Sequence, residues 1–180
     1  PAFPVAKKGG RWRGVVDFRW LNENTLADGY PLPRIEDILT TMGRKKVFSV
    51  LDLKDAFHQI PMHPDSQAVT VTSTPKGLLH WQVLAQGLKN GQFQRVVDHV
   101  LQKFKGFAIP YFDDIIIGSA KAKDTWEEAV EEHEGHVRLV LEALREHGLV
   151  ADRAKTNLFV PRAEFRGHIL ENGTRSPAPG

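Results

Sequence analysis

Two adjacent aspartates lie where unpaired charge is costly. Asp113 and Asp114 sit between the apolar runs 107–110 and 115–117, and acids so placed need a compensating partner. A strand, a tight turn and a second strand would present both carboxylates at a hairpin tip, where a divalent cation with oxygen ligands could offset their repulsion. Two-metal phosphoryl transfer needs such a site. A solvated hairpin tip is the alternative, because aspartate is a common turn residue.

A third acid lies upstream, near the end of a β-rich run. The run 47–53 ends in Leu51-Asp52-Leu53, and its apolar, β-prone residues predict a second strand. That strand could deliver Asp52 to the same sheet edge as Asp113 and Asp114. Three carboxylates on neighbouring strands can hold two magnesium ions, and manganese suits the same oxygen ligands.

Composition limits the class of protein. At 180 residues the chain can form one sizeable domain, or a core with a smaller subdomain. A formal charge of +2 permits polyanion binding without requiring it. With no cysteine there is neither a disulfide framework nor a thiolate metal site, which favours cytoplasm or nucleus. No apolar stretch is long enough for a membrane span. The Pro-rich ends read as linkers, so we expect a segment of a longer polyprotein.

The remaining pattern predicts strands interleaved with helices. The expected class is α+β, with an antiparallel sheet and helices on one face. Asp124 is expected to cap the longest helix and Gly148 to end it. The predicted strands span 11–18, 47–53, 68–74, 79–84, 156–160 and 164–170, and the predicted helices span 34–42, 92–104 and 125–147.

Taken together, these motifs resemble a reverse transcriptase, most closely that of gypsy-type LTR retrotransposons and their retroviral relatives. The resemblance covers almost the whole chain in the family's order. It rests on segments 11–19 (RWRGVVDFR), 30–35 (YPLPRI), 51–60 (LDLKDAFHQI), 81–84 (WQVL), 86–90 (QGLKN), 111–114 (YFDD) and 165–168 (FRGH).

The resemblance implies the fold and activity of a right-hand polymerase. Residues 1–180 would form one fingers and palm module, with fingers at roughly 1–46 and 61–90 and palm at roughly 47–60 and 91–170. Thumb, connection and RNase H portions would be absent. The implied activity is RNA-directed DNA synthesis, in which dNTPs are added to a primer 3′-hydroxyl on an RNA or DNA template. RNase H and integrase portions of the same polyprotein are implied partners, and a cytoplasmic virus-like particle or the nucleus is the implied location.

The resemblance also assigns roles to residues at the metal and nucleotide sites. Asp52 and Asp113 would bridge two Mg²⁺ ions, the Leu53 carbonyl would complete one shell, and Asp114 would support the site. The residues that would contact the nucleotide are Arg13 on the triphosphate, the backbone N–H groups of Asp55 and Ala56, Phe57 against the sugar, Gln86, and Lys155 beside the pyrophosphate. Lys7 or Lys8 could add a phosphate contact.

Further residues would contact the template and primer. Gly87 would allow close approach of the template backbone, and Gly167 with His168 would lie on the hairpin that grips the primer terminus. The other implied nucleic-acid contacts are Arg19, Lys89, Tyr111 and Phe112. Simpler interpretations exist for several positions. Gly167 and His168 could be a tight turn with a satisfied histidine, Phe57 could be a core residue, Arg13 could cover a strand edge, and Lys155 could be ordinary surface charge.

The chain departs from the family pattern at three places. Two residues are missing between Asn90 and Phe93, which would rotate the following helix by roughly 200° unless the loop absorbs the change. Ala85 stands where a proline is usual, and Arg166 replaces an apolar residue. These departures leave open a degenerate or domesticated domain that binds nucleic acid without polymerising. A nucleotide cyclase is a third alternative, but it lacks the segment 86–90.

Overall fold

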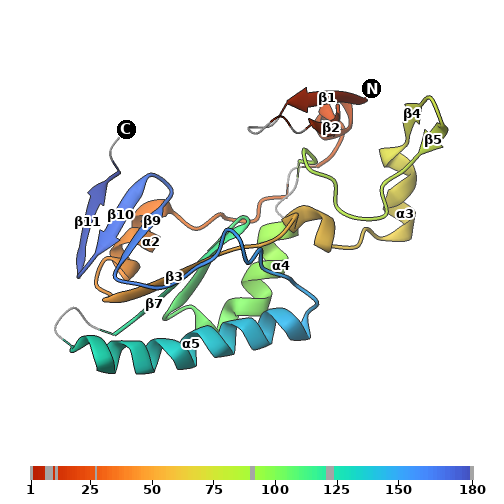
Figure 1. The fold of residues 1–180 in the computed structure, drawn as a ribbon. Coiled ribbons are helices and arrows are strands. Elements are labelled where there is room, and N and C mark those ends of the chain that lie inside the picture. Colours follow the sequence, from red (N-terminus) through yellow and green to blue (C-terminus); the bar gives the residue numbers. More distant parts are fainter. Residues whose placement is uncertain are drawn as a thin grey trace. The chain divides into compact units, whose positions relative to one another are not determined.

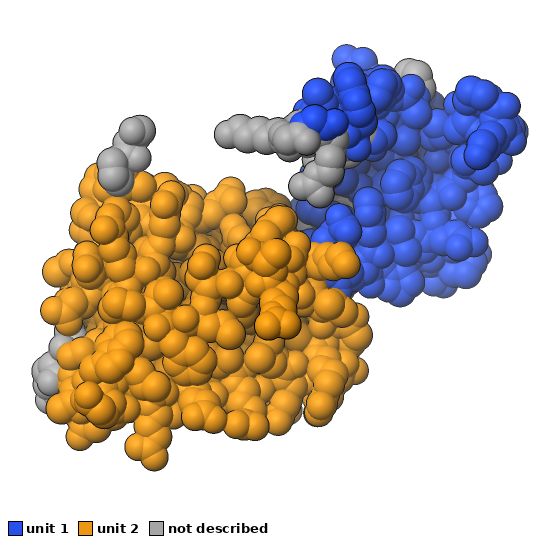
Figure 2. Space-filling model, in the orientation of Figure 1, with its two compact units in different colours: residues 1–29, 55–91 blue, residues 30–54, 92–180 orange. Residues whose placement is uncertain are grey.

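A computed structural model describes residues 2–6, 10, 12–26, 28–89, 92–120 and 124–178, with the backbone but not the side chain of Arg13. The chain forms two compact units (Figure 2). Unit 1 contains Pro1–Gly29 and Asp55–Gly91, and unit 2 contains Tyr30–Lys54 and Gln92–Gly180. In the ranges given above, no helix is both long and apolar enough to cross a membrane.

Unit 2 is built on a four-stranded antiparallel sheet in the order β6-β7-β3-β8 (Figure 1). Its central strands, β3 (Val47–Asp52) and β7 (Asp114–Ser119), are buried along most of their length. Strands covered on both faces read as continuous apolar runs, which explains the segment 115–117. The flanking strands are β6 (Ala108–Tyr111) and β8 (Asn157–Val160).

Two helices cover one face of this sheet. α4 (Gln92–Leu101) packs on β6, and α5 (Trp126–Glu146) packs on β7 and β3. The two residues that this chain lacks relative to the family would fall between Asn90 and Phe93, where positions 90 and 91 are outside the described ranges. α4 nevertheless buries its apolar stripe, including Phe93. Because α4 and α5 lie against antiparallel strands, the predicted α+β class is confirmed.

The long helix α5 begins one residue later than the sequence pattern suggests. Thr125, rather than Asp124, is its N-cap: Thr125 Oγ1 accepts from the Glu128 N–H, and the Glu128 carboxylate accepts from the Thr125 N–H. This capping box satisfies two N-terminal donors reciprocally, which a lone aspartate cannot do. At the other end Gly148 has φ +71 just after the C-cap His147, as predicted.

The opposite face of the sheet carries α2 (Ile35–Met42) and a three-stranded antiparallel sheet in the order β11-β10-β9 (Figure 1). The strands are β9 (Arg162–Phe165), β10 (His168–Glu171) and β11 (Thr174–Pro177). The buried residues that these elements share with the large sheet are Ile38, Leu39, Met42, Phe48, Ile116, Ala163, Phe165 and Leu170.

Unit 1 is a set of short elements. A hairpin of β1 (Ala2–Ala6) and β2 (Trp12–Val16) precedes the helix α1 (Arg19–Glu23). After Asp55 the chain forms the 3-10 helix Ala56–Gln59, α3 (Pro64–Gln67), the 3-10 turn Ala68–Thr70, and a hairpin of β4 (Thr72–Thr74) and β5 (Gly77–Leu79).

Several predicted elements are wrong in their bounds. The segment expected as one strand over 164–170 is a hairpin, because Arg166 and Gly167 both adopt positive φ and reverse the chain. The Pro-rich ends expected as linkers contribute β1 and β11. Residues 80–84 form no strand, and 68–70 form a 3-10 turn in place of a strand. Residues 30–46 lie in unit 2, because α2 buries its apolar face on the sheet.

Candidate active site

The three predicted acids meet at one corner of the large sheet in unit 2. Asp52 ends β3 and is the direct cross-strand partner of Asp114, which begins β7. Cross-strand partners point to the same face of a sheet. The Leu53 N–H donates to the Asp113 carbonyl at 2.7 Å, which ties the next residue of β3 to the turn. Two acids are therefore opposite one another and the third lies in the adjoining turn.

That turn has a strained residue at its tip. Tyr111 pairs with Asp114, so Phe112 and Asp113 form a two-residue loop between β6 and β7. Phe112 has φ +53, as at the first central position of a type II′ turn, where glycine is preferred. An aromatic residue persists in this conformation only if its surroundings enforce it.

A buried glutamine of α4 provides that enforcement. Gln94 is 1% exposed, and its Oε1 accepts from the Phe112 N–H at 2.7 Å while its Nε2 donates to the Pro110 carbonyl at 3.0 Å. Asp98 accepts a further bond from Gln94 Nε2 and one from the Tyr30 hydroxyl at 2.6 Å. This clamp was not predicted from the sequence. The only signal was a polar residue next to Phe93 inside an apolar stripe.

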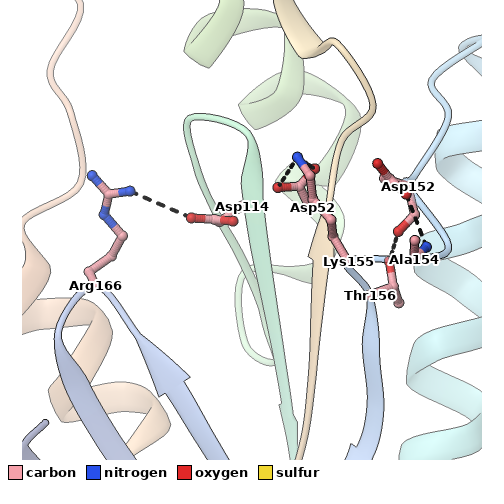
Figure 3. Close-up of polar contacts among 7 residues, drawn as sticks. All are labelled: Asp52, Asp114, Asp152, Ala154, Lys155, Thr156 and Arg166. Carbon is pink, nitrogen blue, oxygen red and sulfur yellow. Dashed lines mark hydrogen bonds and ion pairs between the residues drawn. The ribbon is translucent and has the colours of Figure 1, made fainter. Parts of the chain in front are cut away.

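Two of the acids are paired with cations from different elements (Figure 3). Lys155 Nζ lies 3.0 Å and 3.3 Å from the two carboxylate oxygens of Asp52, and this hydrogen bond raises the pKa of the lysine. Arg166 Nη1 lies 3.6 Å from Asp114 Oδ2. The Asp114 side chain points toward Arg166 and the Asp52 side chain meets Lys155, so each acid is turned to its own cation (Figure 3).

The electrostatics of the corner favour an additional cation. Burial raises the pKa of Asp114, the charges of Asp113 and Asp52 raise it further, and Arg166 opposes the shift. All candidate ligands are hard oxygen donors, the kind that Mg²⁺ takes. Across the part of the chain that the structure describes, no three acidic or histidine side chains are already arranged around a metal position. The ion pairs with Lys155 and Arg166 account for the present directions of Asp52 and Asp114.

A fourth acid near this corner, Asp152, makes hydrogen bonds with backbone groups. Asp152 follows α5 and its N–H donates to the Asp52 carbonyl at 2.7 Å. Its side chain accepts from the Ala154 N–H at 3.0 Å, and its carbonyl accepts from the Thr156 hydroxyl (Figure 3). Asp152 thus shapes the turn that brings Lys155 to Asp52.

The predicted primer residues lie on the β9–β10 hairpin of unit 2. Arg166 and Gly167 form its two-residue turn, and His168 pairs with Phe165 at its base. Arg166 also stacks over Tyr111, with Cζ 5.0 Å from the ring centroid, and Tyr111 makes an edge contact with Phe165. The structure therefore brings His168, Gly167 and Tyr111 into the same unit as the acids.

The other predicted contact residues belong to unit 1. Asp55 adopts a left-handed conformation with φ +46, directly before the buried Ala56 and half-buried Phe57. Arg19 makes a two-point pair with Asp17, at 3.0 Å from Nε and 2.6 Å from Nη2, and this pairing lowers the pKa of Asp17 to about 2. The side chain of Arg13, and Lys7 and Lys8, lie outside the described residues.

Asn22, which was not predicted from the sequence as a site residue, holds the segment 86–89. Asn22 Nδ2 donates to the Gly87 carbonyl at 2.8 Å, and Asn22 Oδ1 accepts from the Lys89 N–H at 2.6 Å. Gly87 has φ +99, so backbone conformation alone requires glycine there. Gln86 and Lys89 are exposed, and Asn22 presents them from a fixed loop.

A second polar network is buried between the sheet and α5. His133 is 0% exposed; its Nε2 lies 2.7 Å from Ser49 Oγ and its Nδ1 lies 2.6 Å from Ser119 Oγ. Ser119 Oγ also lies 2.7 Å from His136 Nδ1, so its single proton can serve only one ring. Glu132, 3.8 Å from His136 Nε2, favours a proton there.

This proton position fixes the rest of the network. His136 Nδ1 then accepts from Ser119, His133 Nδ1 donates to Ser119, and Ser49 donates to His133 Nε2. Ser49 in turn accepts from the Phe159 N–H at 3.1 Å. Burial, aided by His136, lowers the pKa of His133 to about 4, so the ring is neutral at pH 7 and every polar atom has a partner.

Comparison with known proteins identifies the family. Residues 5–170 match the model of "Reverse transcriptase (RNA-dependent DNA polymerase)". The chain is 33% identical over 183 residues to the enzymatic polyprotein of Cauliflower mosaic virus, covering 98% of this chain and 26% of that protein. It is 36% identical over 186 residues to the gypsy Pol polyprotein of Drosophila melanogaster, covering 98% of this chain and 17% of that protein.

Solved structures agree. The protease–reverse transcriptase of a foamy virus, in complex with double-stranded DNA, matches with a TM-score of 0.87 and 29% identity, covering 99% of this chain and 30% of that one. A second foamy virus structure, in complex with an RNA/DNA hybrid, matches with a TM-score of 0.85. The chain therefore belongs to the reverse transcriptase family. It spans about a quarter of the length of the first curated relatives.

Proposed function

We propose that this chain is the fingers and palm part of an RNA-directed DNA polymerase that adds dNTPs to a primer 3′-hydroxyl. The observation that carries the proposal is the register of β3 and β7, which sets Asp52 opposite Asp114 with Asp113 in the connecting turn. Unit 2 would be the palm with part of the fingers-to-palm connection, and unit 1 the fingers.

In this proposal Asp52, Asp113 and the Leu53 carbonyl would hold two Mg²⁺ ions, and Asp114 would support the site. When bound, the ions would lower the pKa of the primer hydroxyl and stabilise charge on the attacked phosphate. The raised pKa of Asp114 supports this assignment, because a cation relieves the repulsion that causes the shift.

The remaining site residues act on the substrates. Lys155 would donate a proton to the leaving pyrophosphate; its raised pKa and its hydrogen bond to Asp52 support this role, because they keep it protonated beside the acids. The N–H groups of Asp55 and Ala56, in the turn after β3, would bind triphosphate oxygens. Phe57 would exclude ribonucleotides by sterics, and Arg13 and Gln86 would contact the nucleotide.

Template and primer would contact a separate set of groups. The β9–β10 turn with Gly167 and His168 would hold the primer, and Tyr111 and Phe112 of the acid hairpin would lie beneath its terminus. Gly87, Lys89 and Arg19 would contact the template. RNase H and integrase portions of a common polyprotein are the proposed covalent partners.

Primer extension tests the proposal. We expect labelled dNTP incorporation on a homopolymer RNA template with Mg²⁺ by a foamy virus reverse transcriptase that supplies the thumb and in which this chain replaces the matching segment. Asp113→Asn should abolish incorporation, whereas the matched control Asp37→Asn, at an exposed acid of α2 with no role in the proposed site, should not. Equal background incorporation by the parent and Asp113→Asn chimeras, with template binding retained, would instead support the degenerate nucleic-acid-binding domain.

A further inference from the structure

The side chain of Arg166 has an unusual origin. It leaves the two-residue turn between β9 and β10, where Arg166 has φ +50 and Gly167 has φ +78. Both central residues of a type I′ turn have positive φ, and asparagine or glycine is preferred there. The positive φ is unfavourable for an arginine backbone, so local conformation does not explain why an arginine is present here. What distinguishes it is the reach of its guanidinium.

The guanidinium reaches the acid corner from the side opposite Lys155. Figure 3 shows Asp114 between Arg166 and Asp52, with Lys155 beside Asp52. Arg166 Nη1 lies 3.6 Å from Asp114 Oδ2, and Lys155 Nζ lies 3.0 Å from Asp52 Oδ1. The two cross-strand acids are thus neutralised separately, each by one positive charge.

The two pairs differ in strength. Lys155 makes a hydrogen bond at each Asp52 oxygen, at 3.0 Å and 3.3 Å, whereas Arg166 lies at the longer ion-pair distance of 3.6 Å from Asp114, and both pairs are partly exposed. A partly exposed ion pair contributes little net stability and exchanges readily. The Tyr111 ring, 5.0 Å from Arg166 Cζ, offers the guanidinium a second favourable contact that does not involve the acid.

We propose that Arg166 is a built-in counter-ion of Asp114, which competes with divalent metal for this acid and thereby sets the affinity of the site for metal. The proposal rests on the function proposed above, in which the acids bind metal. Arg166 and a metal ion cannot both neutralise the same carboxylate at full strength, so each weakens the binding of the other, and this coupling is reciprocal.

Binding of Mn²⁺ to the 180-residue chain, followed by the loss of its free EPR signal at about 0.1 M ionic strength, where the Debye length is about 10 Å, tests the proposal without requiring polymerase activity. Arg166→Gln should bind Mn²⁺ about fivefold or more tightly than the parent, within the usual range of coupling between sites. Arg166→Met is a second neutral replacement, expected to behave alike. Arg166→Lys keeps the charge and should stay near the parent.

Arg162→Gln is the matched control, because Arg162 is an exposed arginine at the other end of β9, roughly 13 Å from Arg166 along the strand. Its affinity should match the parent within about twofold, since exposed charges beyond a Debye length are largely screened. In an Asp114→Asn background, Arg166→Gln should no longer change the affinity, because the acid for which the two cations compete has been removed.

The outcomes separate the two proposals. If Asp114→Asn weakens Mn²⁺ binding but Arg166→Gln and Arg166→Met bind as the parent does, the metal site stands and the counter-ion is rejected. Weaker binding by both neutral variants would also reject it. If Mn²⁺ binding by the parent is unaffected by replacement of Asp52, Asp113 and Asp114 together, the metal site itself is rejected.

Discussion

The strands β3 and β7 carry two polar clusters of opposite character. At one end of the pair lies the acid corner, with Asp52 and Asp114. Further along the same strands, Ser49 and Ser119 bond to the buried His133. The serine–histidine network is neutral, wholly buried and fully hydrogen-bonded, whereas the acid corner is charged, partly exposed and paired with cations from two other elements.

This difference indicates a division of work along the two strands. A buried polar network is stable only when each member is satisfied, and it then has a single arrangement. Charges at a half-exposed edge can change partners at small cost. The network can therefore hold β3 and β7 on α5 while the acids remain free to exchange Lys155 and Arg166 for other cations. Changes at the acid corner should therefore lower activity more than stability, whereas changes at the serine–histidine network should lower stability.

The largest effect should come from the acid corner. Asp52→Asn removes a charge that we assign to metal binding, and incorporation in the foamy virus chimera should fall at least about a thousandfold, equivalent to about 4 kcal/mol in the barrier. The midpoint of thermal unfolding should change little, because the lost pair with Lys155 is partly exposed. A large fall in the unfolding midpoint would mean that Asp52 is structural and would break the comparison.

The second effect is a pH dependence of stability at the buried network. The pKa of His133 is lowered from 6.5 to about 4 in the folded chain. Below pH 6.5 the unfolded chain takes up a proton that the folded chain rejects, so stability falls until about pH 4, by about 3 kcal/mol in total. Urea unfolding between pH 7 and pH 4 measures this loss.

The variant His133→Phe separates the contribution of His133 from that of its charged and titratable neighbours. His136 acts on His133, and Glu132 and Lys45 act on His136. His133→Phe should be less stable at pH 7, because Ser49 and Ser119 lose their partner, but its stability should fall less steeply toward pH 4. Arg138→Gln, on the exposed side of the same helix, should retain the parental slope. A parental slope in His133→Phe would refute the assignment.

The smallest effect concerns the clamp that α4 places on the acid turn. Gln94→Leu leaves the Phe112 N–H and the Pro110 carbonyl without their partner, which should cost about 2 kcal/mol in the free energy of unfolding. Incorporation by the chimera should also fall, measured well below both unfolding midpoints, because the acid turn loses its clamp. Gln102→Leu, at an exposed position after α4, should change neither quantity. Unchanged incorporation by Gln94→Leu would show that the turn keeps its shape unaided.

Local patterns in the sequence predicted the acid hairpin and the main helices. Apolar spacing located α4 and α5, and continuous apolar runs located β3 and β7, because each of these signals lies within a few residues. The local pattern over 164–170 predicted a single strand, since arginine gives no sign of positive φ, whereas the family resemblance placed Gly167 and His168 on a hairpin, which the structure shows. No clear sequence pattern at the ends of the chain indicated the strands β1 and β11.

The polar partners were missed for a different reason. Ser49 and His133 are 84 positions apart, and Asn22 and Gly87 are 65 apart, so neither pair is visible in a local window. The pairing of Asp114 with Arg166 depends on two sheets packing face to face. The sequence indicated which residues could perform chemistry, but the packing of distant segments decides which groups orient and neutralise them.

A crystal structure grown with Mn²⁺ would test the central claim most directly. The account predicts an anomalous manganese peak at the corner of β3 and β7, beside Asp52, Asp113 and Asp114, with Arg166 withdrawn from Asp114 toward Tyr111 and the His133 network unchanged. A structure with saturating Mn²⁺, no peak at this corner, and Lys155 and Arg166 still paired with their acids would contradict it.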